Sequence, residues 1–190
     1  MMESIERIRA NDQTSATVQR GAEVKEEMFL TGYFTFECYD KDGRLKWKET
    51  MKNQVTTVGA NLMLDTMFAG SGYTAAWYMG LVAGPGSGTT YSAGDTMAIH
   101  AGWTEDTTYS NGTRPAITFA SASSAAISTS APSVFNINGT ATIAGGFVVN
   151  NSTKGGTSGT LYSAKDFTGG DRNVVNGDTL NVSYTTTITV

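Results

Sequence analysis

Residues 34–49, FTFECYDKDGRLKWKE, decide the fold class of this chain. Phe34, Phe36 and Cys38 alternate with more polar residues, and this period of two buries one face of a β-strand. Residues 40–43 are the turn formers Asp-Lys-Asp-Gly, whose glycine tolerates the positive φ of a tight turn. Alternation resumes over 45–49, so the sequence predicts a β-hairpin.

Further strand patterns follow this hairpin. They lie at 76–82, 116–120, 133–143, 146–149, 159–162 and 179–190. The uncharged run at 76–82 predicts a central strand that is buried on both faces. Six to nine strands with one helix predict a mostly β fold. We expect a single β-sandwich domain, of the jelly-roll or immunoglobulin-like kind, over residues 29–190.

One short helix is predicted near residues 57–68. Thr56 or Thr57 can cap its first turn, and Gly70 can take the left-handed conformation that ends it. One face of this helix carries the apolar residues Ala60, Leu64, Met67 and Phe68. We expect that face to pack on the sheet.

Residues 1–28 differ from the rest in composition. Residues 1–52 hold 19 of the 30 charged side chains, and Ile5 with Ile8 is an apolar pair at helical spacing within the first 28 residues. Such a segment buries too little apolar surface to fold alone, and it can order against a partner. We therefore predict an extended N-terminal arm. Its candidate partner-binding residues are Ile5, Arg7, Ile8, Arg9 and Arg20.

Net charge and hydropathy exclude some classes of partner. The formal charge of −4 argues against nucleic acid, whose binders concentrate Lys and Arg on one face. No apolar stretch is long enough to span a bilayer and no signal peptide is evident, so we expect a chain made in a cytoplasm without a membrane partner. The single cysteine, Cys38, lies in an apolar run and is predicted to be a buried thiol.

Residue types that usually carry catalysis are scarce. The chain has one histidine, His100, and no second His or Cys lies at a metal-ligand spacing from it, so we expect a loop histidine bonded to backbone. Three aspartates in glycine-rich turns are either turn caps or ligands of a structural calcium ion: Asp166, Asp171 and Asp178. A sugar-cleaving carboxylate pair near Asp95 and Glu105 has no positive support. We predict no enzymatic activity, no catalytic residues and no cofactor.

The connection over residues 89–115 is long and aromatic, as in loops that are functional or packed over the core. It follows a glycine-rich run at 84–89 that lacks the Gly-Lys-Ser/Thr ending of a phosphate loop. Trp47 and Trp77 fall in predicted strands, which leaves Trp103 as the exposed aromatic platform. We therefore count Trp103 among the candidate partner-binding residues.

A series of short motifs carries a family resemblance over residues 33–190. In chain order these are DGRLKW (42–47), NQVTTVGANLMLD (53–65), WYMGLV (77–82), AGDTM (93–97), AGWTE (101–105), TRP (113–115) and AGGF (144–147). Taken as an ordered series, they resemble a widespread family of virion proteins of tailed bacteriophages.

The resemblance implies a particle component without enzymatic activity. Within that class we expect a head decoration, or cement, protein on the capsid surface that binds the outside of the major capsid protein. It implies a homo-oligomer, for which a trimer suits a three-fold position of the shell. The alternative is a tail, baseplate or fibre component that contacts a host receptor or glycan, with Trp103 as the stacking residue.

Overall fold

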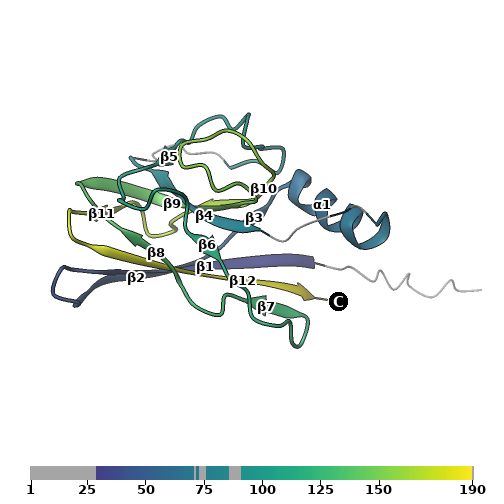
Figure 1. Ribbon diagram of the computed structural model, residues 1–190, viewed down its shortest axis with the longest axis horizontal. Coiled ribbons are helices and arrows are strands. Elements are labelled where there is room, and N and C mark those ends of the chain that lie inside the picture. Colours follow the sequence, from purple (N-terminus) through teal and green to yellow (C-terminus); the bar gives the residue numbers. More distant parts are fainter. Residues whose placement is uncertain (1–28, 71, 73–75, 86–90, 190) are drawn as a thin grey trace, which may run out of the picture.

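The computed structural model describes residues 29–70, 72, 76–85 and 91–189. Within these residues the chain forms twelve β-strands and one α-helix, shown in Figure 1. The elements are β1 (Phe29–Tyr39), β2 (Leu45–Lys52), β3 (Gln54–Val55), α1 (Thr57–Phe68), β4 (Trp77–Ala83), β5 (Glu105–Asp106), β6 (Ala116–Ile117), β7 (Ala126–Ser128), β8 (Ser133–Asn136), β9 (Ala141–Val149), β10 (Leu161–Asp166), β11 (Arg172–Val174) and β12 (Thr179–Thr189).

Two antiparallel sheets form a single β-sandwich, as predicted (Figure 1). Sheet A has the order β2-β1-β12-β7, and β8 also pairs with β12. Sheet B has the order β3-β10-β9-β4-β5, with β11 pairing β9 and β6 pairing β4. The first and last long strands lie side by side in sheet A, because β1 pairs with β12 along its whole length.

The hairpin that decides the fold is present. Phe34, Phe36 and Cys38 are fully buried, and β1 pairs with β2 around a turn in which Gly43 has φ +78°. These side chains meet inner-face residues of sheet B such as Met79 in one core between the sheets.

Sheet B is buried on its other face as well. There Val82 and Phe147 join Met97 and Trp103 of the loop that follows β4 in a second apolar cluster. The long aromatic connection therefore packs over the core. β4 lies between β9 and the short strands β5 and β6, with its middle residues buried, which confirms the prediction of a central strand.

Helix α1 begins and ends where the sequence indicates. The Thr56 hydroxyl accepts a hydrogen bond from the Gly59 N–H (3.1 Å), and Gly70 has φ +66° just beyond the helix. Gly59 lies against the Tyr162 backbone of β10, where an added Cβ would come within 2.8 Å of the Tyr162 Cα. The helix thus docks on sheet B through the close approach of its backbone at Gly59, and this contact does not require an apolar helix face.

The prediction of which helix face packs on the sheet is wrong. Three of the four apolar residues assigned to the packed face are exposed: Leu64 (52%), Met67 (77%) and Phe68 (79%). Gly59 is the buried residue of α1.

Strand number was underestimated, since twelve strands occur in the described residues where six to nine were expected. The additional strands are short pieces of two or three residues, such as β3 and β5. The break predicted between the strands at 133–143 and 146–149 is absent, because β9 runs without interruption through Ala144 and Gly145. A break occurs earlier instead, since 137–140 form no strand.

Candidate partner-binding sites

Trp103 is not an exposed platform, which corrects the sequence-based expectation. Its side chain is 5% exposed, and its indole N–H donates to Asp95 Oδ2 over 3.2 Å. The ring packs on Phe147 at a centroid distance of 5.3 Å and stacks on Tyr91 at 5.9 Å. Since the indole is enclosed on these sides, Trp103 anchors its loop to sheet B.

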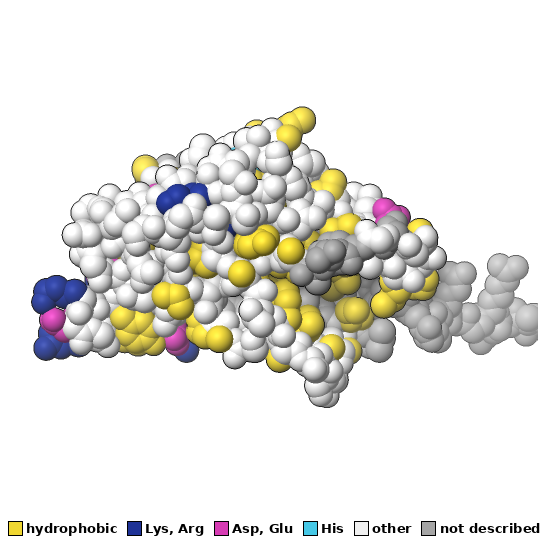
Figure 2. All heavy atoms as spheres, viewed as in Figure 1, with side chains coloured by type: hydrophobic (Ala, Val, Ile, Leu, Met, Phe, Trp, Pro, Cys, Tyr) yellow, Lys and Arg dark blue, Asp and Glu magenta, His cyan; other side chains and the backbone are white. Residues whose placement is uncertain are grey.

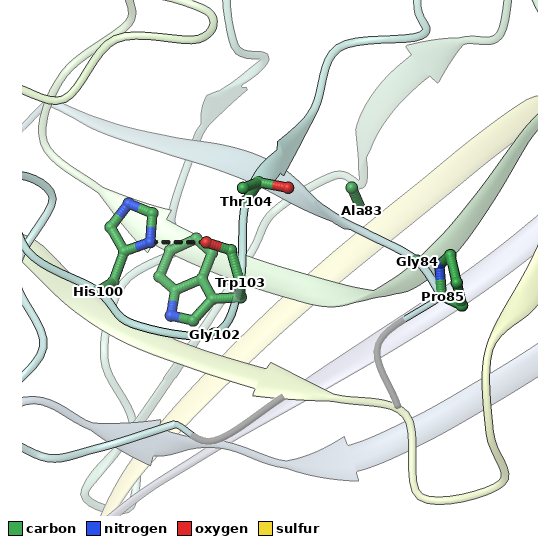
Figure 3. Close-up of a pocket in the computed structure, with 7 residues that line it drawn as sticks. All are labelled: Ala83, Gly84, Pro85, His100, Gly102, Trp103 and Thr104. Atoms are coloured by element: carbon green, nitrogen blue, oxygen red, sulfur yellow. Dashed lines mark hydrogen bonds between the residues drawn. The ribbon is translucent and has the colours of Figure 1, made fainter. Parts of the chain in front are cut away.

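His100 and Trp103 line a pocket of about 410 Å³ (Figure 3). The imidazole and indole rings stack 3.9 Å apart, and His100 Nδ1 is 3.0 Å from the Trp103 carbonyl oxygen. This bond to backbone confirms the expectation for His100. The lining residues other than His100 carry no ionisable side chain: Ala83, Gly84, Pro85, Gly102, Trp103 and Thr104. Among the described residues that line the pocket, His100 is the one titratable side chain.

The carboxylates near this loop serve its packing. Glu105 receives two hydrogen bonds from the fully buried guanidinium of Arg114, at 2.9 and 2.7 Å. Arg114 also donates to the carbonyl oxygens of Asn151 and Gly156, and its guanidinium lies 5.2 Å from the Phe147 ring centre. This cluster, the Arg114 clamp, ties the loop after β4 to the loop after β9. Arg114 lies in the motif TRP at 113–115, but nothing in the sequence indicates that it pairs with Glu105.

Near the β1–β2 turn, Asp178 forms a polar cluster at the edge of the core. Its carboxylate accepts from the Val175 N–H (2.8 Å) and pairs with Lys46 (2.5 Å), so Asp178 has the turn-capping role. The Cys38 thiol donates to the same carboxylate over 3.8 Å. Burial, together with the charge of Asp178, raises the pKa of the Cys38 thiol to about 12. Cys38 is thus a buried and unreactive thiol at neutral pH.

Five of the six predicted partner-binding residues lie outside the described residues: Ile5, Arg7, Ile8, Arg9 and Arg20. Their proposed roles stay predictions. The sixth, Trp103, is buried.

An apolar surface around α1 is the feature that the sequence reasoning missed. Exposed hydrophobic side chains gather along the helix and the neighbouring ends of the sheet A strands β1 and β12, at the right-hand end of Figure 2. They are Phe29, Met63, Leu64, Met67, Phe68 and Ile188. A signal existed in the sequence, because residues 60, 63, 64 and 67 are all apolar and recur at helical spacing. We name the outermost pair, Met67 and Phe68, the α1 ridge.

No protein-family model, no curated protein and no solved structure matches this chain. In the part of the chain that the structure describes, no three His, Cys, Asp or Glu side chains come together as metal ligands. No helix among these residues is long and apolar enough to cross a membrane.

Proposed function

We propose that this chain is a non-enzymatic structural protein of a tailed-bacteriophage virion, and that it decorates the outside of the head by binding the major capsid protein. The motif series over residues 33–190 supports the class. The α1 ridge carries the proposal, because apolar side chains exposed to this degree favour burial against another protein.

The body of the protein suits a surface-binding role. Charged side chains of the described residues collect at the β1–β2 hairpin, where Lys41, Asp42 and Arg44 form exposed ion pairs at the left-hand tip in Figure 2. The apolar α1 ridge lies at the other end. A molecule with unlike ends can make an apolar contact with one neighbour and keep a solvated end in water.

Several copies on one shell would strengthen weak individual contacts through avidity. A homo-oligomer, such as a trimer, would place several arms and several α1 ridges on the shell together. Neither nucleic acid nor a membrane is a partner in this proposal. The tail-fibre alternative depended on Trp103 as a stacking platform, and a side chain buried against Asp95 and Phe147 does not favour it.

Mixing the purified protein with expanded, undecorated capsids of the phage that encodes it tests the proposal. Cryo-electron microscopy should show one density per symmetry position on the outer shell, with occupancy that saturates as protein is added. Bare shells would contradict decoration and would favour the tail.

The arm is expected to anchor the protein. Deleting residues 1–27 should leave a folded domain, since β1 begins at Phe29, but should abolish capsid binding. Circular dichroism checks the fold and the same capsid assay checks binding. Occupancy equal to that of the full chain would show that the arm is dispensable.

A further inference from the structure

Helix α1 overhangs an apolar groove. Ala60, Met63 and Leu64 face Leu30 of β1 and Ile188 of β12 across a hollow of about 170 Å³. Met63 also borders a second hollow of about 300 Å³, whose other lining residues are Trp77, Phe119, Ile127, Val148, Tyr162, Tyr184 and Thr186. We name these two adjoining hollows the α1 groove.

The polar atoms that line the α1 groove already have partners. The Tyr184 hydroxyl accepts from Asn53 Nδ2 (2.5 Å), and the Tyr162 hydroxyl lies 3.4 Å from Thr186 Oγ1. The described residues of the groove therefore offer an occupant hydrocarbon and aromatic surface, and none of them carries a charge. Such a groove selects an apolar segment, and grooves beside a helix commonly accept apolar residues at positions i and i+3 or i+4.

The N-terminal arm starts at the edge of this groove. Leu30, which lines the first hollow, pairs in register with Ile188, which also lines it, and Phe29 is the first residue of β1. In the 28 residues before Phe29, Ile5 and Ile8 provide an apolar pair at i and i+3.

The tether has a suitable length. About 20 residues separate Ile8 from Phe29, and a flexible chain of that length has a root-mean-square span of roughly 25 Å. This span is comparable to the diameter of a small domain, which is about 30 Å, and flexible tethers of such length give effective concentrations on the order of millimolar. A segment of the same chain therefore has an advantage over any partner present at micromolar concentration.

We propose that the α1 groove binds the Ile5–Ile8 segment of the same chain's N-terminal arm. The side chains of Ile5 and Ile8 supply the apolar contact, and Arg7, two residues after Ile5, belongs to the opposite face of a helical segment. Seating of the segment requires no capsid, so it holds or fails independently of the decoration function.

Disulfide trapping in the full-length protein tests this contact. In the variant Arg9→Cys/Met67→Cys, one cysteine follows Ile8 directly and the other replaces a 77% exposed residue at the rim of the groove. The native Cys38 is fully buried and does not compete. The matched control is Arg9→Cys/Val175→Cys, because Val175 is 44% exposed and borders the pocket near the β1–β2 turn, at the other end of the molecule.

We expect the 9/67 pair to oxidise at least ten-fold faster than the 9/175 pair, with a product that migrates as a monomer in non-reducing electrophoresis. Adding Ile5→Glu and Ile8→Glu should reduce the 9/67 rate to that of the control. Equal oxidation rates for the two pairs would overturn the proposal. A 9/67 oxidation rate that Ile5→Glu and Ile8→Glu leave unchanged would overturn it as well.

The same gel distinguishes other occupants. A 9/67 disulfide dimer would assign the groove to the arm of a second copy. Rapid dimer formation by the single variant Met67→Cys would place the α1 helices of two copies together instead. Either product, in place of the monomeric one, overturns the assignment to the same chain.

Discussion

The loop from Tyr91 to Pro115 and helix α1 both pack against sheet B, yet they use their side chains in opposite ways. The loop contains little regular structure, but it buries Met97, Trp103 and the charged Arg114. Helix α1 is regular and well capped, but it leaves Met67 and Phe68 in solvent. Regular backbone structure and tight packing are therefore separate properties in this molecule.

The difference indicates which region stabilises the fold and which meets partners. The Arg114 clamp places a charge where water is excluded, and such a charge is tolerated because Glu105 and two carbonyl oxygens surround it. The α1 ridge adds nothing to the core and leaves apolar area for another surface. We expect substitutions in the loop to change stability and substitutions on α1 to change binding.

The largest effect is expected from breaking the Arg114 clamp. Arg114→Met keeps much of the side-chain volume but leaves Glu105, whose side chain is 7% exposed, without its cation. Removing one partner of a buried ion pair typically costs about 3–5 kcal/mol. Urea denaturation followed by fluorescence measures the change in the free energy of unfolding.

The matched control for the clamp is Lys48→Met. Lys48 pairs with Glu37 over 2.8 Å, but its side chain is 53% exposed. Water and salt screen exposed pairs so that they contribute little to stability, and this variant should therefore resemble the wild type. If both variants lost the same stability, the buried clamp would not be a special support of the loop.

A smaller and pH-dependent loss is expected from the other end of the molecule. Burial raises the pKa of Cys38 from 9.0 to about 12, so the unfolded thiol ionises at a lower pH than the folded one. Its contribution to stability is therefore complete below pH 9 and is lost as the pH rises toward 12, by about 1.4 kcal/mol per pH unit. Burial also raises the pKa of Tyr109 and Tyr184, which adds to the loss above pH 10.

Urea denaturation between pH 8 and pH 10 checks this prediction, with Cys38→Ala as the comparison. The alanine variant starts from a lower stability because a cavity replaces the thiol, so the slopes are compared and not the absolute values. The variant should have a shallower slope than the wild type between pH 9 and pH 10, and the slope that remains belongs to the buried tyrosines. A slope unchanged by the substitution would mean that Cys38 is not the titrating group.

The features predicted correctly from sequence are those set by neighbouring residues. Alternation of Phe34, Phe36 and Cys38 predicts β1 because the period of a strand is local, and Thr56 with Gly70 predicts both ends of α1 for the same reason. Strands of two residues such as β3 escape prediction, because only their pairing with a distant strand defines them.

The errors concern contacts between distant residues. Trp103 lies in a loop, and its burial depends on Asp95 and on Phe147 of β9, which no local pattern connects to it. The apolar stripe of α1 was recognised, but a stripe does not say what covers it. Gly59 docks the helix on Tyr162, and the stripe borders the open α1 groove and solvent without being covered by the sheet.

The smallest effect on stability, and the sharpest contrast between the two regions, is expected from Phe68→Ser and Ile99→Ser. Phe68 on α1 is 79% exposed and Ile99 in the loop is 76% exposed. Neither substitution removes a buried contact, so each should change the free energy of unfolding by less than about 0.5 kcal/mol.

Burial of a phenylalanine against a partner contributes roughly 1.5–3 kcal/mol, so Phe68→Ser should weaken capsid binding about ten-fold or more. Ile99→Ser should bind as the wild type does. Equal weakening by both would mean that exposed apolar residues act anywhere on the surface, and that α1 is not the binding region.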